Sequence, residues 1–339
     1  MNILIIKLGA IGDVIRTTSI LPGLKAKYKD CKIDWATKKD SFNVLKNNDL
    51  INITHLIDGS NTLKDKKYDL IISLDDEYSA CELAARIKHK RIIGAYLKKG
   101  QMGKRQRAYT PDSSLWFDMG LISKFGKQKA DQLKAKNKKT YQEIMYKILN
   151  LDYKKQEPIL KSDGKDITFG EKFLQKNNIK KSDILIGVNT GAGGRWEDKK
   201  LSAEKTAELI DKLNAQIKNA KIMLLGGPEE AERNKKIKEI MKTKVIDAGC
   251  NNSLMEFASL ISLCNVLVTG DSLALHIGTA LKKKVVVWFY PTSAQEIELY
   301  SRGIKIIWEG KSYCSYEAKC QYPPKVDIKK IIKAVKKLI

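Results

Sequence analysis

Strand-length apolar runs alternate with helix-length amphipathic segments along most of this 339-residue sequence. Repeated strand and helix units predict parallel sheets with right-handed crossovers, and 339 residues exceed what one core usually accommodates. We therefore expect an α/β protein with two doubly wound domains. The expected strands lie at residues 2–8, 32–36, 53–57, 69–74, 91–95, 184–189, 221–225, 245, 266–268 and 285–289. The expected helices lie at residues 14–28, 41–46, 77–87, 131–149, 167–177, 203–217, 229–241, 254–263, 273–281 and 327–338.

A polar stretch at residues 152–165, which contains Pro158 and Gly164, interrupts the alternation and indicates a domain linker. The predicted domains are an N-terminal one at residues 1–158 and a C-terminal one at residues 159–324, followed by a closing helix at 325–339. Open parallel sheets bind ligands beyond the carboxyl ends of their strands. We therefore expect the active site in the cleft between the two domains.

The segment V-L-V-T-G-D-S-L-A-L-H-I-G-T-A at residues 266–280 reads as a strand, a tight turn and the start of a helix. The N-terminus of a helix following a parallel strand is a ready site for a phosphate. Asp271 and Ser272 alone would read as helix caps, which is the usual role of such residues. His276 lies one helical turn beyond Ser272, and this convergence favours a diphosphate and ribose site.

Three more loops of the second domain fall at the same sheet edge. Residues 189–201, N-T-G-A-G-G-R-W-E-D-K-K-L, are rich in glycine and contain a threonine and cations that suit a phosphate. At residues 225–230, L-G-G-P-E-E, Glu229 or Glu230 could bind a ribose or base, although acids in a first turn often only complement the helix dipole. Residues 289–293, F-Y-P-T-S, place Thr292 and Ser293 at the exit of a strand.

The first domain opens with the strand at residues 2–8 followed by G-A-I-G-D at 9–13. Gly9 and Gly12 do not have the spacing of the dinucleotide fingerprint, and no acidic residue follows at the expected distance, which argues against a nicotinamide site. Asp13 reads either as a helix N-cap or as a carboxylate directed into the ligand cleft.

The charge of the chain is strongly positive, with a net value of +24 that comes mostly from lysine. A lysine-rich surface is one explanation; an anionic membrane surface or a phosphate-bearing substrate is another. Arginine, preferred for base recognition, is scarce, which disfavours nucleic-acid binding. The basic segment at 97–113 lacks periodicity and reads as a solvated loop or as a mobile flap that grips an anionic acceptor. Its candidate acceptor-binding residues are Lys98, Lys104, Arg105 and Arg107.

Six scattered cysteines argue against a disulfide framework. Cys314 and Cys320, six residues apart, could bind a metal, pair, or remain free thiols. No apolar run approaches the roughly 20 residues of a membrane span, and the first residues read as a strand without a signal peptide. A cytoplasmic location is therefore expected.

Five motifs occur in an order that resembles glycosyltransferase family 9, the bacterial heptosyltransferases. They are G-x-x-G-D at 9–13 before a helix with Pro22, N-T-G-A-G at 189–193 with Lys199, G-G-P-E-E at 226–230, G-D-S-L-A-L-H at 270–276 and F-Y-P-T-S at 289–293. The resemblance implies a GT-B fold, with two Rossmann-like domains that face each other across a cleft. In such proteins the last helix commonly returns to the first domain.

The resemblance further implies an inverting, metal-independent transfer of a sugar, typically heptose from ADP-heptose, to a lipopolysaccharide core or related surface glycan. Asp13 would be the general base, and Lys199 would neutralise the leaving diphosphate with help from the backbone N–H groups of Thr190 and Gly191. Glu230 would contact the nucleoside. The residues expected to bind the nucleotide sugar are Thr190, Gly191, Arg195, Glu230, Asp271, Ser272, His276 and Thr292.

The expected partners are the nucleotide-sugar donor and a phosphorylated glycolipid acceptor, with no cofactor and no metal. Peripheral contact with the anionic inner face of the cytoplasmic membrane and a monomeric state are also expected. Two alternatives stay open from the sequence. One is an NAD(P)-dependent oxidoreductase on the same two-domain frame, and the other is a sugar-nucleotide-binding protein without catalysis.

Overall fold

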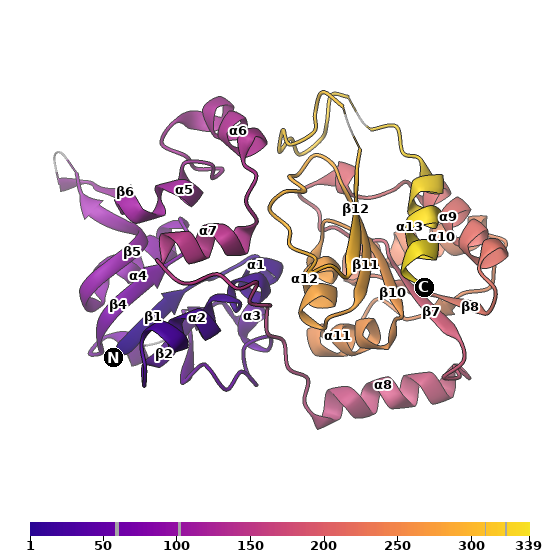
Figure 1. The fold of residues 1–339 in the computed structure, drawn as a ribbon, viewed down its shortest axis with the longest axis horizontal. Coiled ribbons are helices and arrows are strands. Elements are labelled where there is room, and N and C mark those ends of the chain that lie inside the picture. The colour runs from indigo at the N-terminus through magenta and orange to yellow at the C-terminus, as the bar shows by residue number, and fades with distance from the viewer. Residues whose placement is uncertain (58–60, 101–102, 309, 323) are drawn as a thin grey trace. The chain divides into compact units, whose positions relative to one another are not determined.

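The computed structural model describes residues 1–339 except 58–60, 101–102, 309 and 323. The chain divides into two compact units, Met1–Lys161 and Ser162–Ile339 (Figure 1). The division falls inside the polar stretch at residues 152–165, where no helix or strand forms before Gly164. Each unit holds one six-stranded sheet with helices around it, so the predicted α/β class with two doubly wound domains is confirmed.

The first sheet has the strand order β3-β2-β1-β4-β5-β6. Its strands are β1 (Asn2–Ile6), β2 (Lys32–Thr37), β3 (Ile53–Leu56), β4 (Lys67–Ser73), β5 (Lys88–Lys99) and β6 (Arg105–Tyr109). All pairings are parallel except that of β6, which runs antiparallel to β5. β1 is central and residues 3–6 are fully buried, which explains the unbroken apolar run at the start of the sequence.

The helices of the first unit are α1 (Ile11–Thr17), α2 (Ile20–Lys27), α3 (Lys39–Phe42), α4 (Tyr78–Arg86), α5 (Ser114–Phe117), α6 (Gly126–Lys136) and α7 (Tyr141–Ile148). The single helix expected at 14–28 is wrong, because α1 ends at Thr17. Pro22 has no N–H to donate to the carbonyl of Thr18, and it therefore suits the first turn of a second helix. The hydroxyls of Thr18 and Ser19 instead donate to carbonyls in the last turn of α1.

The helix expected at 131–149 is also two helices. α7 has its own start, since Thr140 and Glu143 form a capping box there. The polar segment before it forms α6, which begins earlier than expected at Gly126.

The second sheet has the order β12-β11-β10-β7-β8-β9, and its pairings are all parallel. Its strands are β7 (Ile184–Asn189), β8 (Ala220–Leu225), β9 (Ile246–Asp247), β10 (Val266–Gly270), β11 (Lys284–Phe289) and β12 (Gly303–Ile307). The helices are α8 (Gly164–Lys176), α9 (Ala203–Gln216), α10 (Ala231–Ile240), α11 (Leu254–Leu263), α12 (Leu273–Ala280) and α13 (Ile328–Leu338). Figure 1 shows α11 and α12 on one side of this sheet and α9, α10 and α13 on the other.

The closing helix α13 packs against α9 and against β10, β11 and β12. Its residues Ile331 and Val335 are fully buried in the same apolar cluster as Val268 of β10. The C-terminal helix is therefore part of the second unit, which differs from the expected return to the first domain. In the described part of the chain, none of the helices combines the length and apolarity that crossing a bilayer requires.

Candidate active site

Lys199, Asp271 and Thr292 come together at the carboxyl edge of the second sheet. Lys199 follows β7, Asp271 follows β10 directly, and Thr292 follows β11. The Lys199 ammonium lies 2.8 Å from Asp271 Oδ2, and the Thr292 hydroxyl donates to the same oxygen at 2.6 Å. The backbone carbonyl of Lys199 accepts from the Trp288 indole at 2.8 Å, which ties this loop to β11. Three of the sequence-predicted site residues thus form one cluster.

The carboxylate of Asp271 is ionised in this cluster. Burial alone would raise its pKa, because the charged form is desolvated. The charges of Lys199 and His276 and the hydrogen bonds from Lys199 and Thr292 outweigh burial and lower the pKa of Asp271 to about 2. His276, one turn into α12, therefore acts on the same carboxylate, in line with its predicted position one helical turn beyond Ser272.

Ser272 is the N-cap residue of α12, yet its hydroxyl makes no capping hydrogen bond to the helix. The hydroxyl instead lies 2.9 Å from that of Thr269 and accepts from the Asn189 amide at 3.3 Å. Asn189 also donates to Thr269 and to the Gly191 carbonyl, at 3.0 and 2.8 Å. The start of α12 consequently keeps backbone N–H groups without a side-chain cap, as an anion site requires.

Asn189 and Thr269 were missed by the sequence reasoning, although both are buried. The signal was available: each is a polar residue at the carboxyl end of an otherwise apolar strand. A buried polar side chain in that position needs partners, and a ligand edge supplies them.

Glu230 is packed beneath the glycine-rich loop. Its carboxylate accepts from the Gly227 N–H at 3.0 Å, and a methyl group added at Gly191 would come within 2.6 Å of its Cδ atom. Glycine is therefore needed at 191 for this close approach. Glu230 is only 7% exposed, so it lies deeper than an ordinary first-turn acid.

Thr190 differs from its predicted role. Its backbone N–H donates to the Leu225 carbonyl at 3.2 Å as part of the sheet, and its hydroxyl donates to the Asn234 side chain at 2.6 Å. The Thr190 N–H is therefore not available to a leaving diphosphate in this structure, and its expected role is wrong. The row of hydrogen bonds between β7 and β8 continues one residue past the end of β7, to Thr190. Arg195 is exposed, with its guanidinium 4.8 Å from the centre of the Trp196 ring.

In the first unit, Asp13 is the third residue of α1 at the carboxyl edge of the first sheet. The N-cap is Ala10, so the alternative reading of Asp13 as an N-cap is wrong. Its carboxylate pairs with the Arg16 guanidinium at 2.8 Å and its side chain is 33% exposed. Arg16 is buried and lies 3.9 Å from the centre of the Tyr141 ring, which fixes the guanidinium against the carboxylate.

A buried ion pair between Lys7 and Asp75 lies at the same edge and was missed. Lys7 follows β1 and Asp75 follows β4. Asp75 also accepts from the backbone N–H groups of Leu8 and Gly9, which anchors the turn before α1. Burial works to lower the pKa of Lys7, but the negative charges of Asp75 and Asp13 outweigh it and raise the pKa. Lys7 therefore remains a cation within the electrostatic reach of Asp13.

The neighbouring Asp76 has a raised pKa, caused first by burial and then by the charge of Asp75. Arg107 donates from Nε to the backbone carbonyl of Asp76 at 2.7 Å, and the Tyr109 hydroxyl donates to the Asp76 carboxylate at 3.5 Å. The structure thus brings one of the predicted acceptor-binding cations, Arg107, to the carboxyl end of β4.

The expected loop or flap at 97–113 is instead mostly a β-hairpin formed by β5 and β6. The pairs run from Ala95 with Tyr109 to Lys99 with Arg105, and the Gly100 N–H donates to the Lys104 carbonyl at 2.7 Å. The strand pattern escaped detection because the hairpin's exposed positions are charged. Lys98 and Lys104 are exposed, and Arg105 pairs with Glu82 at 3.2 Å on the surface. Residues 101–102 of the expected flap lie outside the described residues.

Cys314 and Cys320 are both buried. Within the described ranges, no three side chains of histidine, cysteine, aspartate or glutamate are placed to hold a metal ion. Burial raises the pKa of Cys320 to about 12, so this thiol stays protonated.

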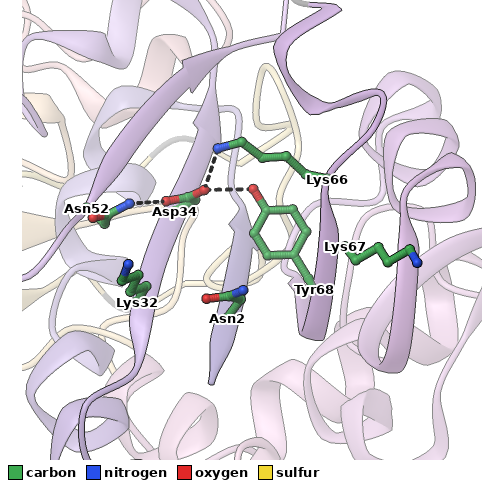
Figure 2. Close-up of a pocket in the computed structure, with 7 residues that line it drawn as sticks. All are labelled: Asn2, Lys32, Asp34, Asn52, Lys66, Lys67 and Tyr68. Atoms are coloured by element: carbon green, nitrogen blue, oxygen red, sulfur yellow. Dashed lines mark hydrogen bonds and ion pairs between the residues drawn. The ribbon is translucent and has the colours of Figure 1, made fainter.

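A cavity of about 320 Å³ lies away from these residues, at the amino ends of β1, β2 and β4 (Figure 2). Asp34 is buried beside it and accepts from Asn52, Lys66 and Tyr68 at 3.0, 3.0 and 2.7 Å. Burial opposes ionisation of Asp34, but hydrogen bonds, His55 first among them, keep its pKa well below the ordinary value. These bonds tie β2 to β4 and to the start of β3, which makes Asp34 a structural centre at the edge opposite Asp13.

Known proteins resemble this chain in both family and fold. The family model described as glycosyltransferase family 9 (heptosyltransferase) matches residues 59–325. A glycosyltransferase family 9 structure from Veillonella parvula DSM 2008 is 19% identical and has a TM-score of 0.75, with 99% of this chain and 96% of that chain covered. A comparison with proteins of curated function found no match.

Two Escherichia coli structures extend the likeness. ADP-heptose lps heptosyltransferase II is 17% identical with a TM-score of 0.69, covering 100% of this chain and 98% of that chain. Heptosyltransferase WaaC with ADP is 17% identical with a TM-score of 0.57, covering 99% and 96%. At such identities the structures support the fold, which is the GT-B type expected, with two Rossmann-like domains. Because the family model spans well over half of the sequence, the chain belongs to glycosyltransferase family 9 (heptosyltransferase), and it is a glycosyltransferase.

Proposed function

We propose that this glycosyltransferase moves a heptose from ADP-heptose to a lipopolysaccharide core or a related surface glycan, with inversion at the anomeric carbon. The observation that carries the proposal is the cluster of Lys199, Asp271 and Thr292 beside the uncapped start of α12. A cation and free helix N–H groups together suit a diphosphate. Escherichia coli WaaC has been solved with ADP and with ADP-2-deoxy-2-fluoro heptose, which supports an ADP-sugar as donor.

The donor site proposed here uses the loops at the carboxyl edge of the second sheet. Lys199 turns from Asp271 toward the diphosphate, while Thr292 keeps its hydrogen bond to the Asp271 carboxylate. Ser272 and His276 contact the phosphates and ribose from α12, and Glu230 contacts the nucleoside beneath Gly191. Arg195, which is exposed, adds a cation at the mouth of the glycine-rich loop.

In the reaction, Asp13 accepts the proton of the acceptor hydroxyl as that oxygen attacks the anomeric carbon. The bond from the anomeric carbon to the diphosphate breaks, and ADP leaves with its charge balanced by Lys199 and the α12 N–H groups. Arg16 holds the Asp13 carboxylate in a fixed direction through their 2.8 Å pair. Since Lys199 supplies the positive charge, we propose that the transfer needs no metal.

The acceptor is proposed to be a phosphorylated glycolipid bound by the first unit. Lys98, Lys104 and Arg105 lie on the β5–β6 hairpin and Arg107 reaches the carboxyl end of β4. Such a substrate places the protein at the cytoplasmic face of the membrane, where the excess of lysine favours anionic lipid. We propose that the protein works there as a monomer.

The experiment that tests the proposal is the substitution Asp13→Asn, with ADP release and ADP binding measured on the same preparation. Loss of a general base should lower the transfer rate by about 10²–10⁴-fold and leave ADP affinity unchanged. The matched control is Asp40→Asn, because Asp40 is also a first-turn aspartate of a short helix in this unit. Equal activity of Asp13→Asn and the wild type would contradict the assigned base, and binding of NAD in place of ADP would favour an oxidoreductase.

A further inference from the structure

Three large apolar side chains are exposed within five residues of the first unit, between α5 and α6. Leu121 is 44% exposed, Ile122 is 45% exposed and Phe125 is 50% exposed. We call residues 121–125 the apolar loop. Single exposed apolar residues are ordinary, but three together on one loop point to a partner.

Lysines outnumber acidic residues around the apolar loop, although Lys124 pairs with Asp118 at 3.3 Å and Lys127 pairs with Asp131. Residues 121–139 contain seven lysines and a single acidic residue, Asp131. Lys124 lies within the loop, with its ammonium 4.9 Å from the centre of the Phe125 ring, and Lys127 and Lys129 are exposed on the first turn of α6. Apolar side chains flanked by lysine are suited to an anionic bilayer, where the apolar groups enter the acyl boundary and the ammonium groups meet the head groups.

The apolar loop is also joined to the proposed acceptor region. The Tyr109 hydroxyl lies 3.3 Å from the carbonyl of Ile122 and 3.5 Å from the Asp76 carboxylate, and it can donate to either. The Tyr109 ring packs against Phe117 of α5, with ring centres 4.9 Å apart. A bilayer that contacts this loop would therefore lie near Asp76 and Arg107, at the edge of the sheet where the acceptor is proposed to bind.

A second basic surface, on α13, has a different composition. Lys329, Lys330 and Lys333 are exposed there, but the apolar residues of α13 are buried in the core of the second unit. That surface offers charge without any group that could enter the acyl region. The apolar loop is thus the better candidate for contact with a membrane.

We propose that the apolar loop, with Lys124, Lys127 and Lys129, is the element that seats this protein on an anionic lipid bilayer. The inference rests on the proposed function, since it supplies the route by which a glycolipid acceptor reaches the first unit. Vesicles without any acceptor suffice to examine it, so its outcome is separate from that of the transfer reaction.

The test is flotation of the full chain with vesicles made of equal parts phosphatidylglycerol and phosphatidylcholine. The first variant combines Leu121→Ser, Ile122→Ser and Phe125→Ser. Its partition coefficient between water and vesicles should fall by more than about tenfold, because three side chains that can enter the bilayer are lost. The matched control combines Ile167→Ser, Ile240→Ser and Tyr322→Ser, whose side chains are 56%, 41% and 47% exposed on the second unit. This control should float as the wild type does.

Charge is tested separately with Lys124→Gln, Lys127→Gln and Lys129→Gln, against Lys329→Gln, Lys330→Gln and Lys333→Gln on α13. The first set should weaken binding to the mixed vesicles, and this loss of binding should be smaller at high salt because exposed charges are screened. The second set should leave binding to the vesicles unchanged. Quenching by brominated lipid should also be stronger in Phe125→Trp than in the wild type.

ADP titration of every variant shows whether the second unit is intact. A wild type that does not float, an apolar-loop variant that floats normally, or loss of binding in the α13 variant would each overturn the proposal. Normal ADP binding and transfer to a deacylated acceptor in those cases would leave the proposed function standing.

Discussion

The ammonium of Lys199 and the carboxylate of Asp271 lie 2.8 Å apart, on side chains that are only 11% and 14% exposed. Each of these charges compensates the other. Removing one partner of a buried pair leaves an uncompensated charge, which is strongly destabilising. We therefore expect Lys199→Met to lower the free energy of unfolding by about 3 kcal/mol as well as to weaken ADP binding.

The double variant Lys199→Met with Asp271→Asn separates stability from function. Replacing both charges should recover most of the unfolding free energy measured by urea titration, because no buried charge remains unpaired. ADP affinity should stay low, since the cation for the diphosphate is still missing. If the double variant binds ADP as the wild type does, Lys199 does not hold the diphosphate.

Asp271 should also make stability depend on pH. Its folded pKa of about 2 lies below the ordinary value of 3.8, so the unfolded chain takes up the proton first as the pH falls. The stabilisation is complete above about pH 4 and is lost as the pH falls toward 2, by about 2 kcal/mol in total. Thermal unfolding of the wild type and Asp271→Asn should show a stability difference that narrows over this range. A difference that stays constant from pH 5 to pH 2 would mean that Asp271 does not titrate there.

Gly191→Ala should disturb Glu230. The added methyl would lie 2.6 Å from Glu230 Cδ, and the buried carboxylate has little room to move. We expect about 1–3 kcal/mol of destabilisation and a weaker affinity for ADP in calorimetric titration. Gly194→Ala is the matched control, because its new methyl would meet only Glu229 at an ordinary 3.8 Å. Comparable ADP affinity in both variants would argue against a nucleoside site beneath residue 191.

The nucleotide preference follows from the proposed donor. Calorimetric titration with ADP, UDP, GDP and NAD should give the tightest binding for ADP, by at least about 1.4 kcal/mol, or tenfold. Lys199→Ala should weaken that binding, for the same reason as Lys199→Met. If UDP or GDP binds most tightly instead, the protein is still a glycosyltransferase, but ADP-heptose is not its donor.

The basic β5–β6 hairpin should affect the acceptor and not the donor. The test variant combines Lys104→Gln, Arg105→Gln and Arg107→Gln. It should raise the KM for the acceptor by about tenfold, because each exposed cation contributes modestly to phosphate binding. Lys88→Gln, Lys90→Gln and Arg91→Gln, at the opposite end of β5, form the control and should leave KM unchanged. A change in the donor KM with the hairpin variant would assign these residues to another role.

The fold was largely predictable because the spacing of apolar residues, from which the strands and helices were predicted, is also what forms the buried core. The strand predicted at 184–189 and the helix predicted at 254–263 coincide with β7 and α11, and the apolar residues in the middle of each element are buried. β6 was not predictable in this way. Its first three residues, Arg105, Gln106 and Arg107, are exposed at the edge of the sheet, so no alternation with buried apolar residues marks them as a strand.

The candidate site was predictable where polar residues follow a strand within a motif, as with Asp271 and Lys199. It was not predictable where the partner comes from a distant segment. Lys7 and Asp75 are 68 residues apart and meet only because β1 and β4 are neighbours in the sheet. The reassignment of the Thr190 N–H to the Leu225 carbonyl likewise depends on strand register, which a single sequence does not give.

The carboxyl edge of the second sheet has a sharp boundary between scaffold and site. Val188 and Val268 belong to the core cluster, whereas Asn189 and Asp271, only one and three residues further on, take part in polar networks. Substitutions that alter ligand preference therefore fall in loops beyond the strands, where they leave the apolar core of the sheet in place. At the donor site proposed here, a few loop substitutions can therefore change the sugar or the base that is bound, while descendants of this chain keep the same apolar core.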